Sequence, residues 1–336
     1  MLITGGLGFI GSNLAHRLVE MGARLSLIDA MVPGEGGNLF NIAGIENKIE
    51  LHVADIGDDS IIERVLDGVD YIFNLAGNVS HIDSMADPQS DLAINCGAQL
   101  KFLESCRKFS PGAKIVFTST RQVYGKAAYL PVDERHIVLP PDINGIHKLT
   151  AENYHLLYYR LFGMRTVCLR LTNTYGPRQL MHHDRQGFIG WFIRKAMDGG
   201  TIELFGGGTQ RRDLNYVDDV VGALLLAGSS ATADGEILNL GGDLSHSLAE
   251  IADLLMSLTG SGSVENVPFP PERTSIDIGD FQSDFAKINT LLGWHPRTSL
   301  QDGLTCTIDF YRENREHYWT QIADSIRRSE TTTCRD

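Results

Sequence analysis

The sequence predicts an α/β fold, a doubly wound parallel sheet with a smaller C-terminal part, because short apolar strands alternate with helical segments along its first half. Residues 2–4 read as an apolar strand that stops at a glycine pair, and the apolar positions of 9–21 recur with a helical period. The alternation continues, with strands expected at 24–29, 49–53, 70–75 and 113–118 and helices at 60–66 and 89–109. Such strand–helix–strand units join parallel strands through right-handed crossovers.

The alternation becomes less regular after residue 118. Long helices are expected over 145–162 and 248–259. Further strands are expected at 166–171, 201–205 and 237–240, and loops at 175–187 and 264–284. The polar segment 320–336 is expected to be a frayed tail.

Charge and cysteine content exclude several classes of function. The 336 residues carry 29 Lys and Arg against 42 Asp and Glu, a net charge of −13, so neither nucleic acid nor an anionic membrane surface is an expected partner. Five scattered cysteines without a CxxC pair fit a reducing compartment better than disulfides or a metal site. The longest apolar run, 220–227, is too short to cross a bilayer. Met1 leads at once into the glycines, which leaves no room for a signal peptide. A cytoplasmic protein is expected.

The segment 4–11, Thr-Gly-Gly-Leu-Gly-Phe-Ile-Gly, places Gly5, Gly8 and Gly11 at a spacing of three between a strand and a helix. Glycines there let the backbone turn tightly and approach a pyrophosphate at the helix N-terminus. Asp29 ends the next strand, 18 residues after Gly11. A carboxylate at that point accepts hydrogen bonds from ribose hydroxyls and repels a 2′-phosphate. The pattern therefore predicts NAD as the cofactor.

Later motifs, together with these glycines, resemble the extended short-chain dehydrogenase/reductase family, in particular its NAD-dependent nucleotide-sugar epimerases and dehydratases. The motifs are Leu75-Ala76-Gly77, the segment 118–125, Lys148, Asn173-Thr-Tyr-Gly-Pro177, Arg212-Asp213 and the segment 291–296. The resemblance covers almost the whole chain. It implies a Rossmann-like NAD-binding domain over 1–172, with segments returning near 215–245 and 297–312. It also implies a substrate-binding part formed by 173–214 and 246–296.

The resemblance further implies contacts and an assembly. The residues expected to contact NAD are Gly5, Gly8, Phe9, Ile10, Gly11, Asp29, Asp55, Ile56, Leu75, Ala76, Gly77, Asn95, Thr118 and Lys148. A homodimer is expected through the Lys148 helix and the helix before it. The apolar residues expected on that face are Leu100, Phe102, Leu103, Leu156, Leu157 and Tyr158.

The catalytic segment departs from the family pattern at one position. The resemblance assigns Thr120 as the active-site hydroxyl and Lys148 as the lysine, but Asn144 stands four residues before Lys148, where the family has its tyrosine base. An amide does not titrate, so three alternatives are open. Another group transfers the proton, namely Tyr124, His147 or His81. Alternatively, Lys148 itself acts as the base, either directly or through a water molecule. Or the protein binds cofactor and sugar without turnover.

The two residues after Thr120 limit which reactions of the family are possible. The 4,6-dehydratases of the family carry an Asp and a Glu there, which act as acid and base in water elimination, whereas this chain has Arg121 and Gln122. Neither side chain shuttles a proton at neutral pH. Reversible oxidation at the sugar ring is what remains, either for 4-epimerisation or as a step toward decarboxylation of a uronic acid. Arg121 would suit a sugar carboxylate.

A nucleotide diphosphate needs fixed positive charge, which this acidic chain has to supply locally. The expected substrate contacts are Ser80, His81, Arg121, Gln122, Asn173, Arg185, Arg212 and Arg273. The function expected is NAD-dependent epimerisation of a nucleotide-sugar at C4 through a 4-keto intermediate. The alternatives are nucleotide-hexuronate decarboxylation, 4,6-dehydration, or a non-catalytic protein that binds NAD and a nucleotide-sugar.

Overall fold

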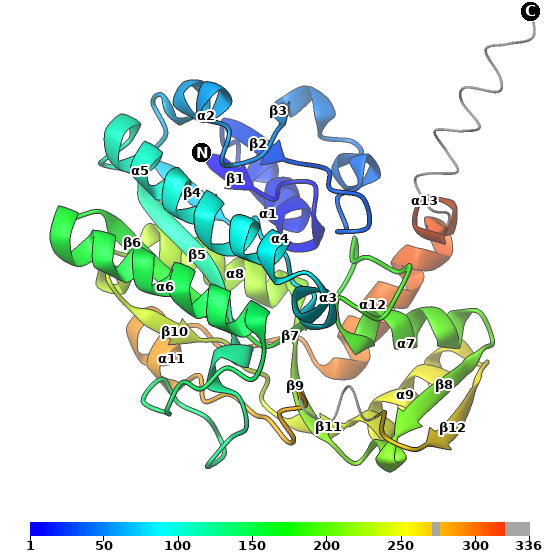
Figure 1. Ribbon diagram of the computed structural model, residues 1–336. Helices are drawn as coiled ribbons and strands as arrows, with labels where there is room; N and C mark the ends of the chain where they lie inside the picture. The colour runs from blue at the N-terminus through cyan, green and yellow to red at the C-terminus, as the bar shows by residue number, and fades with distance from the viewer. Residues whose placement is uncertain (271–275, 320–336) are drawn as a thin grey trace, which may run out of the picture.

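The structure, a computed structural model, describes residues 1–270 and 276–319 and is built on one large parallel sheet (Figure 1). Its seven strands run in the order β10-β6-β5-β4-β1-β2-β3, and every neighbouring pair is parallel. They are β1 Leu2–Thr4, β2 Leu25–Asp29, β3 Ile49–Val53, β4 Tyr71–Asn74, β5 Lys114–Thr120, β6 Arg165–Leu171 and β10 Ile237–Asn239. The predicted doubly wound, Rossmann-like sheet is confirmed.

Alternate residues of each strand face two different hydrophobic cores, as the two-residue period of a strand requires. Ile3 of β1 packs in the core beneath α1 (Phe9–Glu20) and α8 (Val217–Ser229). Its neighbour Leu2 packs in the core on the opposite face. The helices on that face are α2 (Asp59–Leu66), α5 (Gln99–Phe109) and α6 (Ile143–Phe162).

A third core lies beyond the central sheet, at the lower right of Figure 1. It joins α7 (Phe188–Met197), α9 (Leu248–Thr259), α12 (Leu300–Glu313) and α13 (Arg315–Trp319). Two small sheets flank it: β7 (Asn173–Tyr175), β9 (Arg211–Tyr216) and β11 (Ser245–Ser247) form one, and β8 (Thr201–Phe205) with β12 (Ser263–Val267) forms the other. Helix α11 (Ala286–Leu292) packs back toward β10. We propose the predicted division into 1–172 and 173–214 with 246–296, and their returning segments, as the domain boundaries.

Three expectations need correction. The helix expected over 89–109 is split into α4 (Pro88–Leu92), a π-helical turn (Ala93–Ala98) and α5, because one wider turn interrupts the regular hydrogen bonding. The loop expected from 264 contains β12, which pairs in parallel with β8. Of the expected dimer face, Phe102, Leu103 and Tyr158 instead belong to the core between helix and sheet. Arg273 and the tail 320–336 lie outside the described residues.

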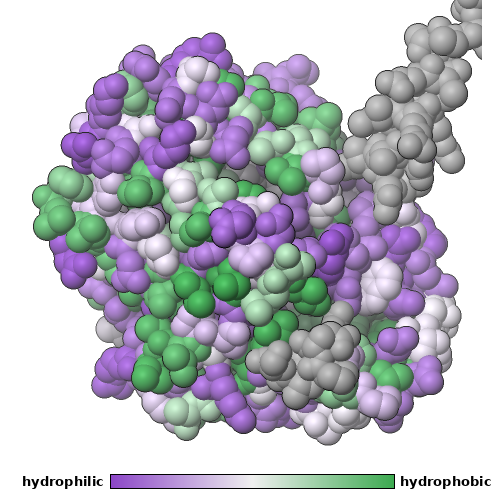
Figure 2. All heavy atoms as spheres, viewed as in Figure 1, coloured by the Kyte–Doolittle hydropathy of each residue, from purple (hydrophilic) through white to green (hydrophobic). Residues whose placement is uncertain are grey.

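Apolar side chains are also exposed on the surface, over α6 and the loop that precedes it, as the green patches of Figure 2 show. The exposed residues there are Tyr129, Leu130, Ile137, Val138, Leu139, Ile146, Leu157, Tyr159, Leu161 and Phe162. In the described part of the chain, no helix combines the length and apolarity that a membrane span requires.

A buried ion pair fixes α6 on the sheet. Glu152 of α6 accepts a 2.9 Å hydrogen bond from Nε of Arg170 on β6, and both side chains are at most 4% exposed. The Arg170 guanidinium also lies 4.7 Å from the ring centre of Tyr124. Because Glu152 is four residues after Lys148, this pair sets how the active-site turn of α6 sits against the sheet.

We expect Glu152→Gln to destabilise the fold by about 3 kcal/mol, because it leaves the Arg170 charge buried without its counter-charge. Denaturant unfolding followed by circular dichroism measures this loss. Asp309→Asn, which breaks the exposed Arg312–Asp309 pair, is the matched control and should cost less than about 1 kcal/mol. Equal losses in the two variants would contradict the assignment of Glu152–Arg170 as a structural anchor.

Candidate active site

A cavity of about 720 Å³ opens where the strands of the central sheet end. Its wall includes the glycine loop after β1, Asp29 at the end of β2 and Thr120 at the end of β5. The sheet order reverses between β1 and β4, and ligands of doubly wound sheets bind outside the carboxyl ends of the strands at such a point. The cavity therefore lies where the fold by itself predicts a ligand.

The glycine loop has the shape that a dinucleotide requires. A Cβ on Gly11 would lie 2.2 Å from the carbonyl oxygen of Gly5, so only glycine permits this turn. Helix α1 begins immediately after Gly8, which offers no side-chain cap to the first N–H groups. Those N–H groups can bind a pyrophosphate. Gly5, Gly8, Phe9, Ile10 and Gly11 all line the cavity, as expected of this motif.

Asp29 presents a fixed carboxylate on the same wall. Its two oxygens accept hydrogen bonds from the backbone N–H groups of Leu7 (3.0 Å) and Met31 (2.9 Å). Burial raises the pKa of Asp29, and these N–H groups oppose that rise. Asp55 and Ile56, after β3, also line the cavity. The donor set therefore fits the adenosine half of NAD, with acceptors for ribose hydroxyls.

Lys148 lies buried in the cavity wall, next to Thr118 and Gly77. Nζ of Lys148 donates to the carbonyl oxygen of Thr118 (3.4 Å), and a Cβ on Gly77 would come within 2.8 Å of Nζ. The side chain is buried, and burial lowers its pKa to about 8, although Asp91 opposes this. Leu75, Ala76, Gly77, Thr118, Thr120 and Lys148 line one continuous wall of the cavity. A lysine with that pKa can give or take a proton near neutral pH.

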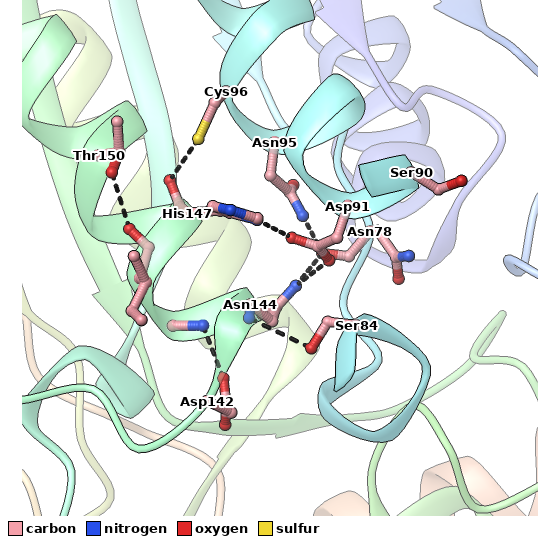
Figure 3. A network of polar contacts seen from close by, with 12 residues as sticks. Asn78, Ser84, Ser90, Asp91, Asn95, Cys96, Asp142, Asn144, His147 and Thr150 are labelled. Carbon is pink, nitrogen blue, oxygen red and sulfur yellow. Dashed lines mark hydrogen bonds and ion pairs between the residues drawn. The ribbon is translucent and has the colours of Figure 1, made fainter. Parts of the chain in front are cut away.

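Asn144 lies on this wall too, and its amide is engaged by neighbours (Figure 3). Its Nδ2 donates to the carbonyl oxygen of Asn78 (2.8 Å) and to Oδ2 of the buried Asp91 (3.0 Å). Its backbone N–H donates to Oγ of Ser84 (3.2 Å). Asn144 therefore holds Asn78, Ser84 and Asp91 together by hydrogen bonds, at the position where a base was expected.

Two of the candidate bases suggested by the sequence do not line the cavity. Tyr124 is 1% exposed and its hydroxyl donates to Oδ1 of Asn239 (2.7 Å), while burial raises its pKa to about 12. His147 is on the other side of Asn144, where Nδ1 donates to Oδ1 of Asp91 (2.6 Å). Of the three groups considered for proton transfer, these two therefore do not face the space that a sugar can enter.

Ser80 and Asn95 also lie behind the wall. The Ser80 hydroxyl caps α3 (His81–Ala86), and Nδ2 of Asn95 donates to the carbonyl oxygen of Asn78. His81, the next residue, does line the cavity, and its Nδ1 lies 3.1 Å from Oδ2 of Asp142. Sequence reasoning missed Asp142. Its place before a helix signalled an N-cap, but its pairing with a residue 61 positions away could not be seen in the sequence.

The far end of the cavity carries the positive charge. Arg121, Gln122, Asn173, Arg185 and Arg212 all line it. Arg212 pairs with Asp277 (3.0 Å) and Arg185 with Asp83 (3.2 Å).

Arg121 differs from these two arginines in its partners. Its Nη2 donates to Oδ1 of Asn173 (3.1 Å), but among residues 1–270 and 276–319 no carboxylate lies within ion-pair distance of it. Burial and the nearby Arg212 lower the pKa of Arg121 to about 9, so it stays a cation at neutral pH.

Comparisons with known proteins agree with this arrangement. The model of a family described as the NAD dependent epimerase/dehydratase family matches residues 1–241. A UDP-glucuronic acid decarboxylase 1 of Xenopus tropicalis is 32% identical over 94% of this chain and 73% of its own length. A UDP-glucose 4-epimerase of Mycolicibacterium smegmatis is 30% identical over 94% and 99%. The crystal structure of a Thermotoga maritima UDP-glucose 4-epimerase with UDP-glucose superposes with a TM-score of 0.85 at 31% identity, over 94% of this chain and 99% of that one.

The buried ammonium of Lys148 predicts a pH-dependent stability. Its folded pKa of about 8 lies below the usual 10.5. Below pH 8 both states hold the proton and the folded state bears the full cost of burial. Between pH 8 and 10.5 only the unfolded state keeps the proton, so the contribution of Lys148 to stability rises with pH.

We therefore expect Lys148→Met to be more stable than the wild type by about 3 kcal/mol at pH 7, with this advantage shrinking as the pH rises toward 10. Denaturant unfolding at pH 7, 8.5 and 10 measures the difference. Lys101→Met, which removes an exposed lysine, should show no such trend. An advantage that does not change with pH would mean that Lys148 is already well solvated.

Proposed function

Since the chain belongs to the NAD-dependent epimerase/dehydratase family, we propose that it is a nucleotide-sugar 4-epimerase that works through a transient 4-keto sugar. The cofactor predicted from the glycine loop, NAD, is the cofactor of the family. The glycine loop, Asp29, Asp55 and Ile56 would hold its adenosine and pyrophosphate, and the wall from Leu75 to Gly77 with Lys148 would hold its nicotinamide end. Bound there, NAD supplies a reversible two-electron acceptor for a sugar carbinol.

One observation carries the choice of reaction: Thr120 and Lys148 share the cavity with the glycine loop, and the two side chains after Thr120 are not acids. Arg121 stays charged, and the Gln122 amide donates to Oδ2 of Asp142 (2.7 Å). Water elimination needs an acid and a base beside the hydroxyl residue. Oxidation followed by reduction on the opposite face needs only one group that takes and returns a proton. This favours epimerisation over 4,6-dehydration.

The arginines at the far end of the cavity support a nucleotide diphosphate as the group that anchors the sugar. Arg212 and Arg185 are each held by one carboxylate, which leaves part of each guanidinium for phosphate oxygens. Asn173 accepts a hydrogen bond from Arg121 and lines the same cavity as Thr120 and the two arginines. The relatives that act on UDP-sugars support the same class of substrate.

A second candidate reaction is decarboxylation of a nucleotide-linked hexuronate. Arg121 favours it, because this cation on the cavity wall has no carboxylate of the described residues within ion-pair distance, although Asp213 and Asp277 act on it from further away, and such a cation suits a sugar carboxylate. The 32% identical UDP-glucuronic acid decarboxylase supports it as well. The same oxidation at C4 begins both reactions, so the site residues keep their roles.

We also propose that the protein is a cytoplasmic homodimer. Cys96, Cys106, Cys168 and Cys306 are free thiols, as a reducing compartment favours. The outward side chains of Leu100 and Leu157, on α5 and α6, are 37% and 38% exposed and could meet their copies in a four-helix contact.

We expect the purified protein to interconvert the C4 epimers of at least one uridine-, guanosine-, adenosine-, cytidine- or thymidine-linked sugar, with NMR reading the product stereochemistry. Carbon dioxide release from a uronate member of the panel would instead identify the decarboxylase.

Arg212→Gln should raise the KM for the nucleotide-sugar at least tenfold, because it removes a charge that binds phosphate. If every sugar is bound and none changes, the protein is a non-catalytic nucleotide-sugar binder and the proposal is wrong.

Arg121→Gln should weaken binding of a nucleotide-linked hexuronate at least tenfold and of the matching neutral hexose less than threefold, because only the uronate offers a carboxylate. Isothermal titration calorimetry measures both affinities. Arg135→Gln, at a side chain that is 91% exposed, is the control and should change neither. Equal losses for both sugars would assign Arg121 to structure rather than to recognition of the carboxylate.

A further inference from the structure

We infer that His81, oriented by the buried carboxylate of Asp142, is the group that exchanges a proton with the sugar hydroxyl in place of the absent tyrosine. This inference rests on the proposed function and adds the acid–base residue that the reaction needs. It comes from a pair of residues that lie far apart in the sequence and meet at the edge of the cavity.

Asp142 is fully enclosed and held from three sides. As N-cap of α6 it accepts a 2.7 Å hydrogen bond from the backbone N–H of Gly145, and its other oxygen accepts one of 2.7 Å from Nε2 of Gln122. His81 is the third neighbour, with Nδ1 at 3.1 Å from Oδ2. Burial by itself raises the pKa of Asp142, but His81, Gly145 and Gln122 outweigh it and hold that pKa below its usual value. Asp142 is therefore a carboxylate at neutral pH.

That carboxylate fixes the state of the imidazole. An anion beside Nδ1 favours the tautomer with its proton on Nδ1, which leaves the lone pair on Nε2. Nδ1 is buried and lies 3.1 Å from Oδ2 of Asp142, at ion-pair distance but without the alignment of a hydrogen bond, whereas 35% of the His81 side chain is exposed and the residue lines the cavity. The attraction between the two groups is therefore electrostatic, and a small rotation of the ring would complete the hydrogen bond. The open edge of the ring is thus the one that carries the basic nitrogen. A histidine that is held by a buried carboxylate and turns its free nitrogen toward a ligand cavity can act as a general base.

The other candidates fail on position or chemistry. The Tyr124 hydroxyl is bound to Asn239 in the core, and His147 is bound to Asp91 behind the wall. The Asn144 amide faces the cavity but does not titrate. Lys148 can titrate and lines the cavity, but its Nζ is buried and donates to the carbonyl oxygen of Thr118 (3.4 Å). Its charge is well placed to support the cofactor end of the cavity.

The proton step balances within this arrangement. The sugar O–H bond breaks as an N–H bond forms at Nε2, while the hydrogen of the C–H bond would leave together with its electron pair, as hydride, to the redox cofactor of the proposed reaction. His81 becomes an imidazolium between the sugar and Asp142. When the carbonyl is reduced, the same proton returns to the same oxygen, so His81 and the cofactor are unchanged over one cycle.

The first test compares two histidines that are both paired through Nδ1 with a buried aspartate. His81→Ala should lower kcat about 100-fold or more, which is the range of general acid–base catalysis, with the affinity for the nucleotide-sugar changed less than threefold. Added imidazole should restore at least tenfold of the lost rate, because it can enter the space that the side chain leaves. His147→Ala leaves Asp91 with Asn144 as its one donor and should lower the stability of the fold. At a temperature at which the variant is folded, it should keep kcat within about threefold and gain nothing from imidazole.

The possible results distinguish a failure of the role proposed for His81 from a failure of the proposed epimerase function. A His81→Ala enzyme that keeps its kcat, or a loss that imidazole never restores while His147→Ala behaves the same way, overturns the role of His81 and leaves the epimerase proposal standing. A wild-type protein that turns over no nucleotide-sugar overturns the proposed function, and the inference with it.

A second measurement needs no turnover. In the full-length protein with ¹⁵N-labelled histidine, assigned by comparison with His81→Ala, neutral His81 should show the Nδ1–H tautomer, and Asp142→Asn should shift the population toward Nε2–H. A wild-type His81 with its proton on Nε2 would present no basic nitrogen to the cavity. That result overturns the inference whatever the activity of the protein.

Discussion

The placement of the first turns of helix α6 is the constraint on which the site depends. Glu152 fastens the helix to β6 through Arg170, and Asp142 closes its first turn. Between these two points, Lys148 is pressed so closely against the chain at Gly77 that a single methyl group there would collide with Nζ. The ammonium is buried, and this burial lowers its pKa. Burying Lys148 costs stability, whereas the Glu152–Arg170 pair, four residues further along the helix, fixes the position of α6.

The first half of the fold could be predicted because its signals are local. Strand β1, the glycine turn and helix α1 follow one another within 20 residues, and each needs only its own residues to be recognised. Strands β9 and β12 could not be predicted in that way. β12 alternates poorly between buried and exposed positions and exists because β8 lies beside it. The π-helical turn before α5 likewise has no period that distinguishes it from the helix on either side.

The residues at the cofactor end of the site could be predicted from the sequence, whereas those at the catalytic end could not, for a physical reason. A pyrophosphate is bound by backbone, so glycine spacing reveals it, whereas proton transfer depends on which way a side chain points. Tyr124 looked suitable in sequence, but Arg170 and Asn239, from two other strands, turn it into the core. His81 gained its partner, Asp142, from 61 residues later, just before α6 begins. Only the folded chain shows these pairs.

The asparagine at position 144 is better understood as one member of a set than as a lost base. Asp91 is buried and accepts one hydrogen bond from His147 and one from Asn144, and the Asn144 amide also satisfies the carbonyl oxygen of Asn78. A tyrosine at 144 would remove both donations and leave Asp91 with a single partner in a site without water access, which is costly for a carboxylate. A tyrosine at position 144 would therefore weaken this set of hydrogen bonds. It would leave the buried Asp91 carboxylate short of a donor, because Asp91, Asn144 and His147 depend on one another. The proton is instead exchanged at His81, beside Asp142 at the start of the same helix.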